Sequence, residues 1–434
     1  MVKQSKHAIN IDRVDISSLL SNITLQVGRY LITLMPFVSL ANPWEITSVS
    51  GNSVRCIDLL YIFAWFIFGL HFLLSGKVNC NVLRLLSIII LYICISLYGV
   101  IAVSNYQVNW AALIRFVQTI SWGVLALTFL GDFAIFKIFS RNIIFSGSIL
   151  ALYSIYLRLT NPNLHRIAGF FSAAGGEGLI GQASFNEIGA LSALAALISF
   201  SYLFYNKKEL SGSDFFLVAT GLILNVISLL LVQSRSGILA LAVGLITFLL
   251  PELKKLLIYG RMRRILIRFI AIFCLTILGI IIGSTLFAGI NRLMLTFSPG
   301  SNEFVSAVTR LSLWRRGLEI WLLDIPHFLL GYGFRSTARF LMAESAHNFF
   351  LNIGLWSGLI GLTFIIVVLI WPLTQVARSK RENFSKQIAT LSFTVAFVVS
   401  MTGNVLVDPF YGGLTFILLY GSLATSSLIK VGEK

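Results

Sequence analysis

The feature that most constrains the fold is a series of apolar runs, each about long enough to cross a lipid bilayer. The 434-residue chain is 57% hydrophobic and only 12% charged, whereas soluble domains average about 25% charged residues. Because a membrane span needs roughly 20 apolar residues, the sequence predicts an all-α polytopic protein with a single transmembrane domain over residues 1–434. The twelve predicted spans lie near residues 24–41, 57–75, 83–102, 110–130, 142–160, 185–205, 214–232, 236–250, 264–288, 347–372, 386–404 and 412–430.

The basic residues indicate how these spans are oriented. The net charge is +16, which in a soluble protein would suggest nucleic acid. In a polytopic protein, however, Lys and Arg gather in cytoplasmic loops, so no nucleic-acid partner is expected. If both termini are cytoplasmic and the first residues form a short polar arm, most basic residues fall on the cytoplasmic side, and only Arg29 and Arg115 lie within spans. This topology is therefore predicted.

The basic residues on the opposite, outer side are all arginine, whereas every lysine is cytoplasmic. A planar guanidinium binds phosphate or carboxylate through two parallel hydrogen bonds, which lysine cannot do. The pattern indicates a phosphate-bearing ligand on the outer side, with compositional drift as the alternative. These arginines are Arg55, Arg158, Arg166, Arg235, Arg292, Arg310, Arg315, Arg316, Arg335 and Arg339.

Two outer connections are unusually long, over about residues 159–184 and 289–346. Long loops in compact proteins are often functional. The second loop contains apolar residues at helical spacing, with Arg315, Arg316 and Glu319 elsewhere on the helix, which predicts an amphipathic helix at the membrane interface. The apolar face consists of Leu311, Trp314, Leu318, Trp321 and Leu322.

Three arginine sites are candidates for ligand binding. Arg235 lies in a short turn between two spans, where charge is costly unless it has a partner or a task; the alternative is that its side chain extends to lipid head groups. Arg310 is followed by Arg315 and Arg316, for which contact with bulk lipid phosphates is the alternative. Arg166 is a third candidate, and a plain loop charge explains it equally well.

His347 stands immediately before an apolar run. Histidine can exchange a proton near neutral pH or bind a metal. The nearest histidine, His327, is not at ligand spacing, and the four cysteines show no metal-binding pattern, so no metal is expected. General base is the better functional hypothesis, with Asn348 orienting the ring and Glu344 biasing its tautomer. A histidine that merely caps the helix is the alternative.

These motifs together resemble the O-antigen ligase and O-antigen polymerase superfamily over roughly residues 160–370. The family signature H-N-x9-G-x2-G is matched by His347, Asn348, Gly358 and Gly361. Four further stretches are similar to that family: "RIAGFF" leading to "FNEIGA", "SRSG" at 234–237, "TRLSLWRRG" around Arg310, and "GYGF" at 331–334.

The resemblance implies a GT-C-like fold and a metal-independent glycosyltransferase in the bacterial inner membrane with a periplasmic active site. The implied donor is an undecaprenyl-pyrophosphate-linked oligosaccharide, with no cofactor. The implied role of His347 is to activate the acceptor hydroxyl. On physical grounds, Arg235 and Arg310 are the arginines expected to stabilise the leaving pyrophosphate. The expected substrate-binding residues are Arg166, Arg315, Arg316, Arg335, Asn348 and Glu344.

Two reactions within this family remain open from the sequence. A polymerase transfers the glycan to a second lipid-linked glycan and has a chain-length regulator protein as a candidate partner; a ligase transfers it to lipid A-core. The short stretch from Arg310 to His347 and the arginine-bearing loop 159–184 favour the polymerase. A transporter of lipid-linked sugars is less favoured, because transporters carry charge along a central path. Membrane lipids are expected partners in every case.

Overall fold

The computed structural model describes most of the chain in defined segments. The described residues are 16–38, 40, 45–49, 52–104, 109–160, 167–168, 172–173, 185–205, 210–259, 295, 297–334, 336, 341, 346–379, 383–403, 405–407 and 411–427.

The prediction of an all-α polytopic membrane protein is confirmed. Every predicted span coincides with a helix, except the one near 264–288, which lies outside the described residues. Within the described segments, seven helices are long and apolar enough to cross a membrane, namely α2 to α7 and α14, and α8 and α15 contain shorter apolar stretches. The long helices of the bundle are α1 (Ile16–Val38), α2 (Cys56–Ser75), α3 (Cys80–Tyr98), α4 (Trp110–Phe129), α5 (Phe133–Thr160), α6 (Phe185–Tyr205), α7 (Gly212–Val232), α8 (Arg235–Tyr259), α14 (Phe349–Arg378), α15 (Asn383–Ser400) and α16 (Tyr411–Ser427).

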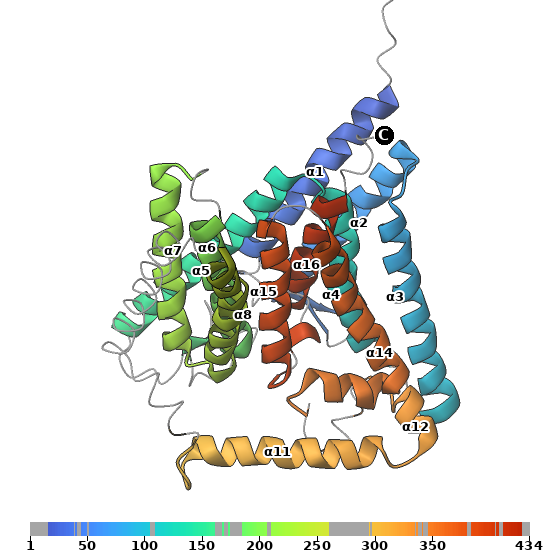
Figure 1. Ribbon diagram of the computed structural model, residues 1–434. Coiled ribbons are helices and arrows are strands. Elements are labelled where there is room, and N and C mark those ends of the chain that lie inside the picture. Colours follow the sequence, from blue (N-terminus) through green and yellow to red (C-terminus); the bar gives the residue numbers. More distant parts are fainter. Residues whose placement is uncertain are drawn as a thin grey trace, which may run out of the picture.

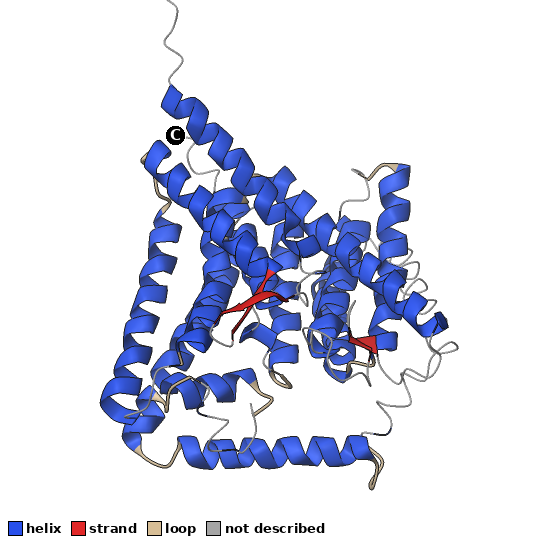
Figure 2. Cartoon of the chain, turned by 180° about the vertical axis from the view of Figure 1, so that it is seen from behind, coloured by secondary structure: helices blue, strands red, loops and turns tan. Residues whose placement is uncertain are grey.

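The remaining elements lie in the connections between these helices. A π-helical segment, Gly99–Ser104, extends α3, and Val405–Val407 forms a 3-10 turn before α16. Two small antiparallel hairpins were not predicted: β1 (Glu45–Val49) pairs with β2 (Asn52–Arg55), and β3 (Ile167–Ala168) pairs with β4 (Ser172–Ala173). Figure 2 shows them as short strands among the helices.

The helix α6 is the centre of one half of the bundle. It packs against α5, α7, α8 and α15, and nearly all of its membrane-spanning stretch is buried. Its sequence is rich in alanine and serine, and small residues allow close approach of neighbouring helices in membranes. In the other half, α4 packs along α16, where Gly123 faces the ring of Tyr420.

The long loop is partly helical and lies across one end of the bundle. It contains α11 (Asn302–Trp321) and α12 (Ile325–Leu330). Figure 1 shows α11 running crosswise below the upright helices, with the start of α1 and the C-terminal end at the opposite end of the bundle. The predicted helix in this loop is therefore confirmed. Its exposed side includes Leu311, Leu318 and Leu322, which are 59%, 45% and 61% exposed, as expected for a helix that borders lipid.

The structure corrects the predicted span 347–372 in one respect. The helix α14 begins at Phe349 and is interrupted at Gly358, whose φ of 65° and ψ of −169° are not helical. The part from Leu359 to Arg378 is about 30 Å long at 1.5 Å per residue, which is enough to cross a bilayer. The part before Gly358 is a separate short helix, seen above α11 in Figure 1, so His347 precedes this short helix and not the membrane span itself.

Candidate functional site

The break in α14 is filled by the "GYGF" stretch at 331–334. The backbone N–H of Tyr332 donates to the carbonyl of Leu355 at 2.6 Å, and that of Gly333 donates to Trp356 at 2.9 Å. Gly331 has a φ of 76°, and a Cβ at this position would lie 2.6 Å from the backbone nitrogen of Gly358. The backbone at Gly331 therefore lies directly against the backbone at Gly358, an approach that only residues without a Cβ allow.

A helix-to-helix contact on the other side of the site also depends on glycine. The helix α11 packs on the first part of α14. A Cβ on Gly317 would lie 2.9 Å from the Leu351 side chain, and one on Gly354 would lie 2.8 Å from the ring of Trp321. The indole of Trp321 donates to the carbonyl of Phe328 at 3.0 Å. This packing fixes the position of α11, and hence of Arg310.

Arg235 is the first residue of α8, after a sharp turn from α7. Gln233 ends α7 with a left-handed φ of 53°, and the hydroxyl of Ser234 accepts the backbone N–H of Gly237 at 3.2 Å. The hydroxyl of Ser236 donates to the side-chain oxygen of Asn186 at 3.0 Å. These contacts hold the half-buried Arg235 at the start of the helix.

The small neighbours of Arg235 lie against α6. A Cβ on Gly237 would lie 2.7 Å from the carbonyl oxygen of Gly189. Gly189 in turn faces the side chain of Ser234. The small residues therefore serve the close contact between α6 and α8.

Arg310 lies in the middle of α11 and reaches the turn after α15. Its Nη1 donates to the carbonyl oxygen of Thr402 at 3.4 Å. The last carbonyls of a helix lack intrahelical donors, and they attract a cation. The half-buried Arg310 is thus held at the end of α15 by a weak bond to a neutral acceptor.

Arg235 and Arg310 line one cavity of about 390 Å³. The indole nitrogen of Trp314 is buried near them with no hydrogen-bond partner among the described residues. The cavity therefore combines two arginine side chains with an apolar side. The other lining residues are Asn186, Ser236, Leu239, Phe297, Ala307, Leu311 and Thr402.

His347 lies close enough to Arg310 for the positive charge of the arginine to lower the pKa of the histidine. Burial of the ring and, second, the positive charge of Arg310 hold the pKa of His347 below its usual 6.5, although the residue as a whole is exposed at the surface. A histidine with such a pKa is neutral at pH 7 and is able to accept a proton. Its backbone has a φ of 51°, and non-glycine residues at positive φ are uncommon.

Two asparagines fix the backbone on either side of His347. The side-chain oxygen of the fully buried Asn352 accepts the backbone N–H of Ala346 at 3.0 Å. Asn348 caps α14 by accepting the N–H of Leu351 at 3.1 Å, and its amide donates to the carbonyl of Met401 at 3.3 Å. Asn348 thus anchors the segment to the turn that also binds Arg310. Its predicted contact with substrate is not tested.

Among the described residues, the other predicted site residues do not line this cavity; these are His347, Asn348, Arg315 and Arg316. Arg315 is 84% exposed and pairs with Glu319 at 2.9 Å, and Arg316 is exposed on the same helix. Both remain predictions for contact with lipid or with an outer part of the substrate. Arg166, Arg335 and Glu344 lie outside the described residues.

Three residues of the site carried little signal in the sequence. Thr402 contributes a backbone carbonyl and Asn352 a side-chain amide, and nothing in the local sequence pattern distinguishes either residue. Trp314 was assigned to an apolar helix face; it also lines the cavity, and its indole nitrogen is buried. A metal site was not expected, and no group of three or more metal-binding side chains occurs in the part of the chain that the structure describes.

Comparison with known proteins gives one family match. Residues 220–366 match the family model described as O-antigen ligase. The match begins in α7, includes Arg235, Arg310 and His347, and ends in α14 beyond the break at Gly358. No curated protein matches the chain closely enough to count as a relative. The match over residues 220–366 therefore supports the similarity of this part of the chain to the superfamily of O-antigen ligases and O-antigen polymerases.

Proposed function

We propose that this protein is a surface-polysaccharide polymerase. In this proposal it transfers an undecaprenyl-pyrophosphate-linked glycan to a lipid-linked repeat unit at the periplasmic face of the bacterial inner membrane. The observation that carries the proposal is the shared cavity of Arg235 and Arg310, together with the influence of Arg310 on His347.

The two arginines are suited to a pyrophosphate leaving group. When the bond from the anomeric carbon to the pyrophosphate oxygen breaks, negative charge develops on the phosphates. Preorganised donors in a water-poor site stabilise such charge strongly, and guanidinium groups bind phosphate through paired hydrogen bonds.

The acceptor needs a base, and His347 is suited to that role. In the proposed step, the acceptor hydroxyl attacks the anomeric carbon and its proton passes to the neutral imidazole. A glycosidic bond forms, and undecaprenyl pyrophosphate leaves. A single displacement of this kind inverts the anomeric centre.

The cavity also has an apolar side that suits a polyprenyl tail. Leu239, Leu311 and Phe297 are 51%, 59% and 77% exposed and line the same cavity as the arginines. Exposed apolar side chains on a membrane protein border lipid. This continuity supports a substrate with a charged head in the cavity and a chain in the bilayer.

The choice between polymerase and ligase rests on the sequence features given above and needs a direct test. The gene is deleted in the native host and the envelope glycans are separated on a gel. Single repeat units attached to lipid A-core are the expected result. Long lipid-linked polymer with bare core would instead identify a ligase, and an unchanged ladder would contradict both.

Metal independence is part of the proposal, because the arginines take the charge-neutralising role of a cation. The purified enzyme is expected to keep its activity in EDTA. Loss of activity that magnesium restores would contradict this part of the mechanism.

A further inference from the structure

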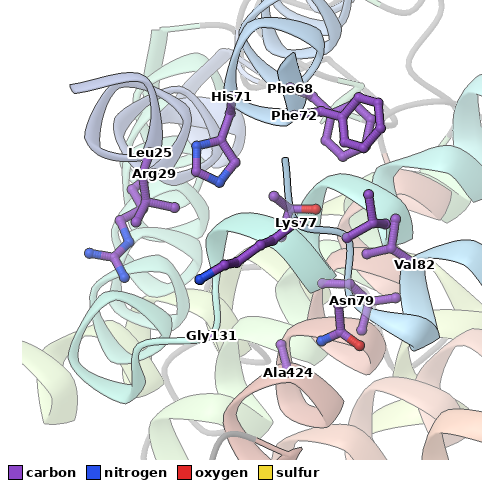
Figure 3. A pocket seen from close by; sticks show the side chains of 13 residues that line it. Leu25, Arg29, Phe68, His71, Phe72, Lys77, Asn79, Val82, Gly131 and Ala424 are labelled. Carbon is purple, nitrogen blue, oxygen red and sulfur yellow. The ribbon is translucent and has the colours of Figure 1, made fainter. Parts of the chain in front are cut away.

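A second cavity lies at the other end of the bundle from α11. It has a volume of about 290 Å³ and is enclosed by α1, α2, α4, the turn between α2 and α3, and the end of α16. Figure 3 shows the side chains of Arg29, His71 and Lys77 around its open space, with Phe68 and Phe72 on the opposite side. The proposed transferase reaction uses none of these residues.

The turn between α2 and α3 is built to present Lys77 to this cavity. Gly76 ends α2 with a φ of 60°, a conformation that suits glycine. The side chain of Asn79 caps α3 by accepting the N–H of Asn81 at 2.9 Å. A helix N-terminus carries a partial positive charge, so the start of α3 adds to the positive potential of the cavity.

Arg29 is the strongest sign of a missing ligand. It is one of the two arginines within predicted spans, and its side chain is only 18% exposed. Its Nε is buried and has no hydrogen-bond partner in the described segments. A charged group so placed in a membrane protein is costly unless it is paired.

The nearby acid does not fully neutralise Arg29. The carboxylate of Asp132 lies 3.9 Å from its Nη2, which is long for an ion pair, and is 44% exposed. The other oxygen of Asp132 accepts the N–H of Ala134 at 2.9 Å. Since Lys77 adds a second cation, the cavity wall has an excess of positive charge over this one acid.

The other side of the cavity is apolar. Leu25, Phe68, Phe72 and Val82 line it, and Phe72 is 43% exposed, while the next residue, Leu73, is 76% exposed. A ligand here would have its charge at Arg29 and Lys77 and its apolar part along the phenylalanines. Inorganic phosphate would contact only the charged part of this surface, at Arg29 and Lys77.

We propose that this cavity binds the phosphate group of an anionic phospholipid, with Arg29 and Lys77 as its ligands and the acyl chains lying along Phe68 and Phe72.

The test measures lipid binding by the purified full-length protein. Protein in a neutral detergent is titrated with phosphatidylglycerol or phosphatidylcholine, and lipids retained per protein are counted by native mass spectrometry. The variants are Arg29→Gln and Lys77→Gln, which remove charge at similar size. The matched control is Arg84→Gln, an exposed arginine on α3 that does not line the cavity.

Wild type and Arg84→Gln are expected to retain one more phosphatidylglycerol molecule per protein than Lys77→Gln or Arg29→Gln. The affinity of these two variants for phosphatidylglycerol should fall about tenfold or more, because a charged hydrogen bond is lost. Lys77 is exposed in a turn, so its variant folds even if the Arg29 variant does not. Equal retention by all variants would show general attraction to a basic protein and overturn the proposal. If inorganic phosphate displaces the retained lipid from wild type alone, the lipid phosphate is bound by Arg29 and Lys77, as proposed. If phosphate stabilises the protein but no lipid is specifically retained, the choice of a lipid as the ligand is overturned.

Discussion

At the residue scale, the central relation is that between Arg310 and His347. Burial of the ring and, second, the positive charge of Arg310 hold the pKa of His347 below its usual 6.5, and a neutral imidazole is the form that a base requires. The same arginine lines the cavity with Arg235. One residue therefore links the charge of the donor site to the protonation of the base.

This relation predicts a shift in the pH profile. In Arg310→Gln the positive charge is lost, so the pKa of His347 rises and the acidic limb of the residual activity moves to higher pH. The wild-type limb is expected below pH 6.5. The profile is measured on purified enzyme with lipid-linked donor, and an unmoved limb would contradict the electrostatic coupling.

Replacement of His347 itself gives a separate prediction. His347→Ala is expected to bind lipid-linked donor normally but to lose product formation by about 10²- to 10⁴-fold, the usual contribution of a general base. Donor binding and turnover are measured on the same preparation. Full turnover would exclude the histidine from the mechanism.

Asn352 is predicted to position this histidine. Its buried amide oxygen accepts the N–H of Ala346, and Asn352→Ala would leave that donor unpaired at a cost of about 1–3 kcal/mol. We expect kcat to fall more than KM changes, because the base moves while the donor cavity stays intact. Asn352→Asp, which retains an acceptor, should recover part of the loss. Equal activity in the alanine variant would refute the positioning role.

At the element scale, the interruption of α14 organises the site. The backbone of residues 331–333 occupies the gap at Gly358, and the short helix before the gap supports α11 through Gly354 and Gly317. Arg310 and His347 are on elements that meet only because the helix is broken. The glycines of the family motif thus have a structural purpose.

The break gives a stability prediction with a matched control. In Gly358→Ala, the residue would adopt a backbone conformation that costs about 1–3 kcal/mol, and its Cβ would collide with the backbone of Leu329. We expect a lower midpoint of thermal unfolding and loss of activity. Gly69→Ala, on α2 with nothing within 4 Å of the new Cβ, should unfold at the wild-type temperature or above. Equal behaviour of the two variants would contradict the proposed packing.

The sequence predicted some elements well for a clear physical reason. Span limits follow from length and hydropathy, so α4, α6 and α7 lie within a few residues of their predictions. Arg235, Arg310 and His347 were singled out because charge beside hydrocarbon is rare, and their roles stay predictions. The break at Gly358 was missed because one glycine in an apolar run leaves no local signal, and the same holds for the single amide of Asn352. Thr402 was missed because its contact with Arg310 joins segments distant in the chain.

At the scale of the whole molecule, the two cavities lie at opposite ends of the helix bundle. The one with Arg235 and Arg310 is beside α11, and the one with Arg29 and Lys77 is beside the turn between α2 and α3. The distribution of lysine and arginine predicts that the second end is cytoplasmic. The transferase proposal requires this orientation.

The orientation is testable with thiol labelling in cells. Cys80 is exposed at the start of α3, and Ser312 is exposed on α11. In a background without the other cysteines, a membrane-impermeant maleimide should label Ser312→Cys from outside the inner membrane and leave Cys80 unlabelled until the membrane is opened. The reverse pattern would invert the topology and remove the periplasmic site.

The most direct measurement is a double-mutant cycle on donor binding. Arg235→Gln, Arg310→Gln, the double variant and the control Arg84→Gln are titrated with undecaprenyl-pyrophosphate-linked glycan. If both guanidinium groups bind one pyrophosphate, each single variant should bind the donor at least about tenfold more weakly than wild type does. The losses of binding free energy in the two single variants should not add up to the loss in the double variant, because both arginines act on the same group. Wild-type affinity in either single variant, or strictly additive losses, would contradict a shared pyrophosphate site.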